Sequence, residues 1–231
     1  MSIAENLAQV NASIRSLETA AGRAPCSVRL LAVSKFHPLE AIIAAIESGQ
    51  RFFGENRVQE AFAKFSALHS QGYDFDLHII GTLQRNKVRD AVKIASCIES
   101  VDRIVLLEEI ERQCAKIDRT IDVLLEVHTG EDSKSGFTDA GELEKAVSLC
   151  LQKTYPHITL KGLMTMAPNT EDVEKIREAF RTVRRLRDAF SEKYGQPLPE
   201  LSMGMSGDYP IAIAEGATIV RVGRAIFGER Q

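Results

Sequence analysis

Leu30-Leu-Ala-Val-Ser-Lys-Phe36 is a short apolar run that ends in a single lysine, Lys35. An apolar run of this length, bounded by turn-forming residues, is typical of a buried β-strand. Residues 28–33 are therefore expected inside the protein, with Lys35 where the strand reaches the surface and Pro38 in the first turn of a helix. Two interpretations of Lys35 stay open. Its charge can simply extend into solvent, or desolvation can lower its pKa so that the amine attacks a carbonyl.

Strand and helix patterns alternate outward from this strand along the whole chain. Strands are expected at residues 28–33, 51–54, 75–80, 97–101, 121–127, 158–164, 201–203 and 218–222. Helices are expected at residues 2–20, 39–48, 55–69, 83–95, 102–116 with Asp102 as the cap, 138–152, 170–194, 208–215 and the C-terminus. Such alternation indicates a parallel α/β fold. The even spacing favours a single (β/α)8 TIM barrel with an extra N-terminal helix, one domain over residues 1–231, rather than a doubly wound sheet.

Composition excludes several classes of function. The net charge of -3 provides no general attraction to nucleic acid or anionic lipid. No stretch approaches the roughly 18 apolar residues of a membrane span, and residues 1–11 show no signal peptide. The cysteines and histidines are scattered without metal-ligand spacing, so a zinc site is not indicated. These features predict a cytoplasmic protein with reduced, mostly buried thiols.

Two glycine-bearing loops follow the last two expected strands. They read Ser202-Met-Gly-Met-Ser-Gly-Asp208 and Arg221-Val-Gly-Arg-Ala-Ile-Phe-Gly228. In (β/α)8 barrels phosphate often binds at these loops, where backbone N–H groups at helix starts face an anion. Gly204, Gly207 and Gly223 would permit close approach of the backbone, and Ser206 would add a hydroxyl. The alternative is that the glycines only make tight turns.

Closure of the barrel would place strand 8 beside strand 1, and therefore the phosphate loops beside Lys35. A ligand with a phosphate at one end and a carbonyl at the other would bridge them, and pyridoxal 5'-phosphate has this shape. Arg221, at the end of strand 8, could reach the pyridine nitrogen of this cofactor. Because arginine stays protonated, it would donate to that nitrogen and weaken the cofactor as an electron sink. A structural ion pair is the other interpretation of Arg221.

Seven phrases, in order over almost the whole chain, resemble the YggS/PROSC family of pyridoxal phosphate homeostasis proteins. They are Leu31-Ala-Val-Ser-Lys35, Phe53-Gly-Glu-Asn-Arg-Val-Gln-Glu60, His78-Ile-Ile-Gly-Thr-Leu-Gln-Arg-Asn-Lys87, Ser133-Lys-Ser-Gly136, Gly162-Leu-Met-Thr165, Leu201-Ser-Met-Gly-Met-Ser206 and Val220-Arg-Val-Gly-Arg-Ala-Ile-Phe-Gly228. The resemblance implies a barrel like the N-terminal domain of alanine racemase, with pyridoxal 5'-phosphate as a Schiff base on Lys35. It implies the following further cofactor contacts: Ser206 and the backbone of Gly223 and Arg224 at the phosphate, Arg221 at the ring nitrogen, and Asn56, His78 and Met164 at the pocket wall.

The resemblance further implies a protein that holds the cofactor in intracellular homeostasis and delivers it to apo-enzymes without clear turnover. A monomer is expected, although the sequence alone does not determine the oligomeric state. The sequence departs from the family at His128, where an asparagine is expected. Lys134 either faces the site or pairs with Glu131 or Asp132. The alternative function is a racemase-like enzyme, which needs a base on each face of its substrate. In the racemases the base opposite lysine is a tyrosine from a second domain, which this sequence does not show. A Schiff-base aldolase is less compatible, because Arg221 would have no role in it.

Overall fold

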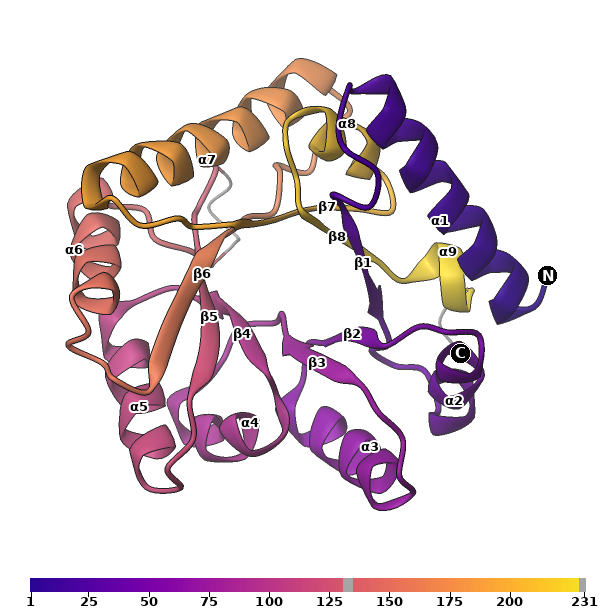
Figure 1. Cartoon of the computed structure of the whole chain (residues 1–231), viewed down its shortest axis with the longest axis horizontal. Helices are drawn as coiled ribbons and strands as arrows, with labels where there is room; N and C mark the ends of the chain where they lie inside the picture. Colours follow the sequence, from indigo (N-terminus) through magenta and orange to yellow (C-terminus); the bar gives the residue numbers. More distant parts are fainter. Residues whose placement is uncertain (131–134, 229–231) are drawn as a thin grey trace.

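The computed structural model describes residues 1–130 and 135–228 and shows a closed barrel of parallel strands (Figure 1). The strands are β1 (Arg29–Val33), β2 (Phe52–Glu55), β3 (Asp76–Ile79), β4 (Cys97–Val101), β5 (Ile121–Glu126), β6 (Ile158–Met164), β7 (Glu200–Met205) and β8 (Ile219–Val222). Each strand pairs with the next, and β8 pairs with β1 through Leu31 opposite Arg221 and Ala32 opposite Val222. The expected (β/α)8 barrel is confirmed, and so is the closure that brings the two ends of the sequence together.

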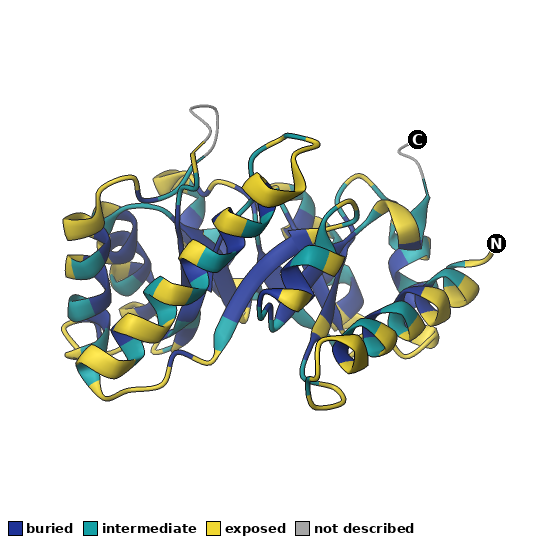
Figure 2. Cartoon of the chain, turned by 90° about the horizontal axis from the view of Figure 1, so that it is seen from above, coloured by how far each residue is buried: buried dark blue, intermediate teal, exposed yellow. Residues whose placement is uncertain are grey.

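Helices form a ring around the strands and turn their buried faces inward (Figures 1 and 2). They are α1 (Ile3–Ala20), α2 (Leu39–Glu47), α3 (Val58–Ser70), the 3-10 helix η1 (Arg85–Lys87), α4 (Val88–Ile94), α5 (Ile104–Ala115), α6 (Ala140–Leu151), α7 (Val173–Tyr194), α8 (Tyr209–Ala214) and α9 (Arg224–Phe227). The additional helix α1 starts at a capping box between Ser2 and Glu5. It packs against α2, α8 and α9, next to the closing pair of strands. No helix in the described ranges is both long and apolar enough to cross a membrane.

The barrel interior differs from the layer between strands and helices. The outer layer is one large apolar cluster, whereas the interior holds two small ones, Leu31, Val33, Phe52 and Ile219, and Cys97, Leu124 and Met164. Buried polar side chains share the interior, among them His78, Glu99 and Arg221, which are 6%, 0% and 4% exposed. Buried charges are tolerated when they are paired and hydrogen-bonded, and the pairing of these residues defines the floor of the candidate site.

The structure corrects several expected element boundaries. The expected helix from residue 55 begins at Val58, because Glu55 is the buried last residue of β2 and pairs with Ile79. Arg103, not Asp102, is the N-cap of α5, and the expected helix 83–95 divides into η1 and α4. Of the four cysteines, three are buried and Cys26 is exposed, and all are free. The described residues contain no His, Cys, Asp and Glu cluster that could hold a metal ion.

Candidate functional site

A cavity of about 390 Å³ opens at the C-terminal ends of the strands, and the residues that line it lie at the ends of, or after, β1, β2, β3, β6, β7 and β8. Six of the eight residues proposed from the sequence line it: Lys35, Asn56, Ser206, Arg221, Gly223 and Arg224. Its size falls within the range of small-molecule sites, roughly 300–1,000 Å³. The C-terminal face is also where (β/α)8 barrels place their active sites. Barrel closure therefore brings Lys35 and Arg224, which are 189 positions apart in the sequence, to one cavity.

Lys35 follows β1 in a tight turn, in which the Ser34 carbonyl accepts a hydrogen bond from His37 N–H at 3.2 Å. Ser34 is fully buried, whereas Lys35 is half-buried and lines the cavity. The strand therefore remains in the core up to the residue before the lysine. This arrangement brings the Lys35 side chain to the cavity wall directly after a buried strand, and an amine there is a candidate nucleophile.

Arg221 forms part of the cavity wall from β8 and is almost completely buried. Its Nη1 donates to the Ser202 carbonyl at 2.7 Å and to Ser202 Oγ at 2.8 Å, and its Nη2 donates to the Thr165 carbonyl at 2.7 Å. Burial lowers the pKa of Arg221, and the charges of Glu99, Asp208 and Glu126 oppose this shift. Since an arginine starts from a very high pKa, the guanidinium remains a cationic donor fixed at the cavity.

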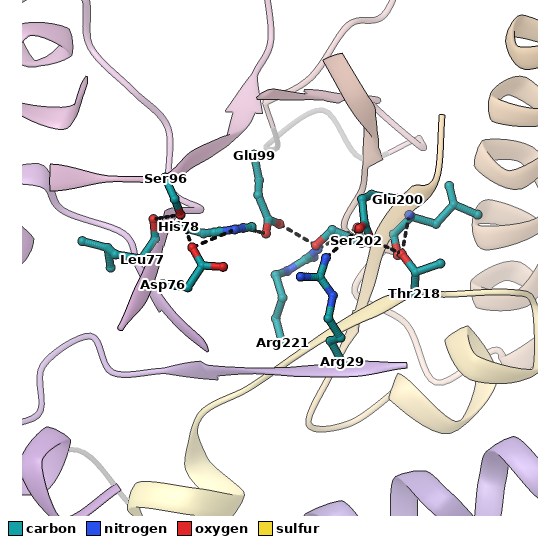
Figure 3. A network of polar contacts seen from close by, with 11 residues as sticks. Arg29, Asp76, Leu77, His78, Ser96, Glu99, Glu200, Ser202, Thr218 and Arg221 are labelled. Atoms are coloured by element: carbon teal, nitrogen blue, oxygen red, sulfur yellow. Dashed lines mark hydrogen bonds and ion pairs between the residues drawn. The ribbon is translucent and has the colours of Figure 1, made fainter. Parts of the chain in front are cut away.

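A chain of buried polar groups supports Arg221 from inside the barrel (Figure 3). Ser202 Oγ donates to Glu99 Oε2, and Glu99 Oε1 lies 2.6 Å from His78 Nδ1. Burial raises the pKa of Glu99, but the hydrogen bond and charge of His78, the charge of Arg221 and the hydrogen bond of Ser202 together bring it below its ordinary value. Glu99 is therefore the buried anion that balances Arg221. Neither Glu99 nor Ser202 was predicted from the sequence, although a polar residue at an inward position of an apolar strand is the available signal.

The glycines of the two loops serve different purposes. Gly204 is buried in β7 at φ 94°, and a Cβ there would lie 2.6 Å from Ala212 Cβ, so this glycine permits α8 to pack. A Cβ on Gly223 would lie 3.1 Å from the Val33 carbonyl, which makes Gly223 a close-approach position between β8 and β1. Gly207 has open space around its Cα. Close approach at Gly204 and Gly223 is thus to the protein itself.

Three other residues singled out in the sequence, His78, Met164 and His128, lie outside this cavity. His78 is in the interior chain described above, and Met164 is 1% exposed in the interior cluster with Cys97 and Leu124. His128 does not line the cavity, and its Nδ1 accepts from Gly130 N–H at 3.3 Å. Lys134 lies outside the described residues.

Comparison with known proteins identifies the family. The Pyridoxal phosphate homeostasis protein of Aquifex aeolicus is 39% identical over 231 residues, which is 100% of both chains. This chain belongs to the pyridoxal phosphate homeostasis protein family. Residues 6–231 also match the family model described as alanine racemase, N-terminal domain.

Two solved structures resemble this chain over different shares of their own length. The structure of PipY of Synechococcus elongatus with PLP bound is 37% identical, covers 98% of this chain and 100% of its own, and superposes with a TM-score of 0.85. Alanine racemase of Corynebacterium glutamicum is 21% identical with a TM-score of 0.71, and this chain covers 61% of it. The second likeness concerns the barrel alone.

Proposed function

We propose that this protein binds pyridoxal 5'-phosphate as a Schiff base on Lys35 and holds it for delivery to apo-enzymes. The observation that carries the proposal is the single cavity in which Lys35, Arg221 and the loops after β7 and β8 meet. The name of the curated relatives and the PLP-bound PipY structure support the choice of cofactor. The word homeostasis in that name supports a role in holding and supplying the cofactor rather than consuming it.

The cavity fits the chemical groups of this cofactor. Lys35 offers an amine for the aldehyde, and Arg221 offers a fixed cationic donor for the ring nitrogen. Asn56 Oδ1 is buried and has no hydrogen-bond partner among the described residues, although buried acceptors are normally paired. A donor on a bound ligand would satisfy it. The residues present therefore match the ligand at three different points.

The phosphate would bind where β7 and β8 end. Ser206 lies on the loop after β7, and Gly223 and Arg224 start α9, where the first N–H groups of a helix have no acceptor within the helix. Such N–H groups, together with a hydroxyl, suit an anion. His78 and Met164 have no contact role in this proposal, and His78 acts through Glu99 on Arg221.

The chemistry of attachment is one condensation. Lys35 would supply the neutral amine nitrogen for the C=N bond to the aldehyde carbon, and the aldehyde oxygen would leave as water. Hydrolysis reverses this step, so that a covalently held cofactor can still be released. The role of the chain is to present the amine, to orient the ring through Arg221 and to retain the phosphate.

Borohydride reduction tests this attachment directly. When the protein is mixed with pyridoxal 5'-phosphate and reduced, the added mass is expected on the peptide that contains Lys35. Peptide mass spectrometry measures it, with Lys35→Ala as the control that loses the label at this position. A label of equal extent on Lys87, Lys134 or Lys161 would contradict the assignment.

Replacing Ser206 by alanine is expected to weaken binding of pyridoxal 5'-phosphate about fivefold, the value of one hydrogen bond of about 1 kcal/mol. The loss is modest because the backbone N–H groups remain. Pyridoxal, which lacks the phosphate, should bind Ser206→Ala and the unmodified protein equally. Absorbance titration with both compounds measures the two affinities. Equal affinity of the unmodified protein for the two compounds would show that no phosphate site exists in this cavity.

A further inference from the structure

The turn that carries Lys35 has an unusual backbone. Phe36, which follows the lysine, adopts φ 65° in the left-handed region. It is the third residue of the turn closed by His37 N–H and the Ser34 carbonyl, a position where positive φ favours glycine or asparagine. A bulky residue in this conformation is strained and persists only when its surroundings hold it there. The contacts around the turn therefore decide whether Lys35 keeps its place.

Two side chains of α3, Glu60 and Lys64, hold this turn through its backbone. Glu60 Oε1 accepts from Phe36 N–H at 2.8 Å. Lys64 Nζ donates to the Ser34 carbonyl at 3.0 Å and the His37 carbonyl at 3.3 Å, the two ends of the turn. Since Glu60 and Lys64 are four residues apart, one face of a single helix presents both.

The charged groups of Glu60 and Lys64 that bind the turn also form ion pairs with each other and with Glu55. Lys64 Nζ lies 2.6 Å from Glu55 Oε1 and 3.0 Å from Glu60 Oε1. Glu55 is fully buried and also accepts from Ser34 Oγ at 2.7 Å, while the Lys64 side chain is only 12% exposed. A buried, mutually paired cluster has little freedom to move, so the turn is held from a rigid support. Neither Glu60 nor Lys64 lines the cavity.

We propose that Glu60 and Lys64 are positioning residues. They keep Phe36 in its left-handed conformation within the turn at residues 34–37 and thereby present the Lys35 amine to the cavity. The inference rests on the proposed function, because it concerns attachment of the cofactor to Lys35. In molecules where the turn relaxes, the amine leaves the attack geometry. The apparent affinity and the rate of attachment then fall by the fraction of molecules that remain competent.

The first variant is Glu60→Ala, which removes the acceptor of Phe36 N–H and leaves Lys64 paired with the buried Glu55. Binding of pyridoxal 5'-phosphate, followed by absorbance, is expected to be about fivefold weaker and about fivefold slower. Glu60→Gln retains an acceptor oxygen and should stay within about twofold of the unmodified protein. In the protein without cofactor, hydrogen exchange at the Phe36 amide should be faster in Glu60→Ala than in Glu60→Gln.

Relief of the backbone strain provides the decisive comparison. Phe36→Gly removes the Cβ that makes positive φ unfavourable, so Glu60→Ala added to it should weaken binding by less than about twofold. Phe36→Ala removes the ring but retains the Cβ, so Glu60→Ala should keep its full fivefold effect there. A role of Glu60 in overall stability alone would produce the same effect in both backgrounds.

Lys64→Met is the stronger variant, and about a tenfold loss of affinity is expected from the two carbonyls it releases. Because Lys64→Met leaves Glu55 buried without its cation, its folding is checked by circular dichroism. If Lys64→Met does not fold, the test rests on the Glu60→Ala measurements. Two outcomes would overturn the inference: unchanged binding in folded Glu60→Ala, or an equal loss of affinity in the Phe36→Gly and Phe36→Ala backgrounds. Either outcome leaves the proposed function intact if borohydride still labels Lys35 in the unmodified protein. Absence of that label in the unmodified protein would overturn the proposed function, and the inference with it.

Discussion

Replacing Arg221 by methionine is expected to lower the free energy of unfolding by about 3 to 5 kcal/mol, the usual loss when a buried charge that compensates another buried charge is removed. Methionine removes the charge of Arg221 from the surroundings of the fully buried Glu99, which keeps His78 as a hydrogen-bond partner. It also leaves the carbonyls of Ser202 and Thr165 without their donor. Urea unfolding followed by circular dichroism measures the change. A loss below about 1 kcal/mol would show that Arg221 is not the charge that balances the barrel interior.

Two companion variants identify the cause of this loss. Arg221→Lys retains the positive charge but not the planar fork, so it should be less damaging than methionine. Glu99→Gln combined with Arg221→Met removes both charges, and the double variant should be more stable than Arg221→Met alone. If the double variant were as unstable as the sum of the two single variants, an orphaned carboxylate would not be the reason.

The stability difference between the unmodified protein and Arg221→Met should depend on pH because of Glu99. Its pKa in the folded protein lies below its ordinary value of 4.5, because His78, Arg221 and Ser202 outweigh the effect of burial. A lowered carboxyl pKa contributes stability that is present above the unfolded value and is lost as the pH falls through the folded value. Arg221→Met weakens this contribution, so the difference in stability between the two proteins should narrow as the pH falls below 4.5.

The order of strands and helices was predictable because the hydrophobic pattern along this chain is consistent with it. β6 lies at the expected residues, Ile158–Met164, and so does β4, at Cys97–Val101. One boundary failed because a polar residue belongs to a strand. Glu55 reads as the start of a helix, but it completes β2 and is buried because Lys64 neutralises it. Only a tertiary contact distinguishes the two interpretations.

The candidate site shows the same division between local and tertiary information. Lys35 and Arg221 could be predicted together, because closure of a (β/α)8 barrel places the last strand beside the first. The roles of Glu99, Ser202 and Lys64 could not be predicted. They depend on which side chains meet inside the barrel or between a helix and the turn beside it. His78 was assigned to the pocket wall, yet it contacts Glu99 one layer below. Sequence order determines which strands are neighbours, whereas side-chain depth in the barrel follows from register.

The identity of Arg221 also bears on what the bound cofactor would do. Racemisation and transamination are both assisted when the pyridine ring accepts negative charge from the substrate carbon. Arg221 is held by Ser202 and Thr165 as a permanent donor, and a donor of this kind leaves the ring nitrogen without a proton. On the binding mode proposed above, we therefore expect the cavity to retain the cofactor and to turn over amino acids poorly. The family model for the alanine racemase domain describes the barrel that both kinds of protein share.

Holo-protein incubated with L-alanine and other amino acids is accordingly expected to show racemase and transaminase rates at least about 10² to 10⁴ below those of an enzyme with a full set of positioned acids and bases. The same protein should activate a pyridoxal phosphate-dependent apo-enzyme added in excess. Chiral chromatography, keto-acid assays and the activity of the recipient measure the three quantities. Holo-protein reduced with borohydride is the matched control, because its cofactor cannot leave Lys35 and transfer should stop. Steady multiple turnover that disappears in Lys35→Ala would establish an enzyme instead of a carrier.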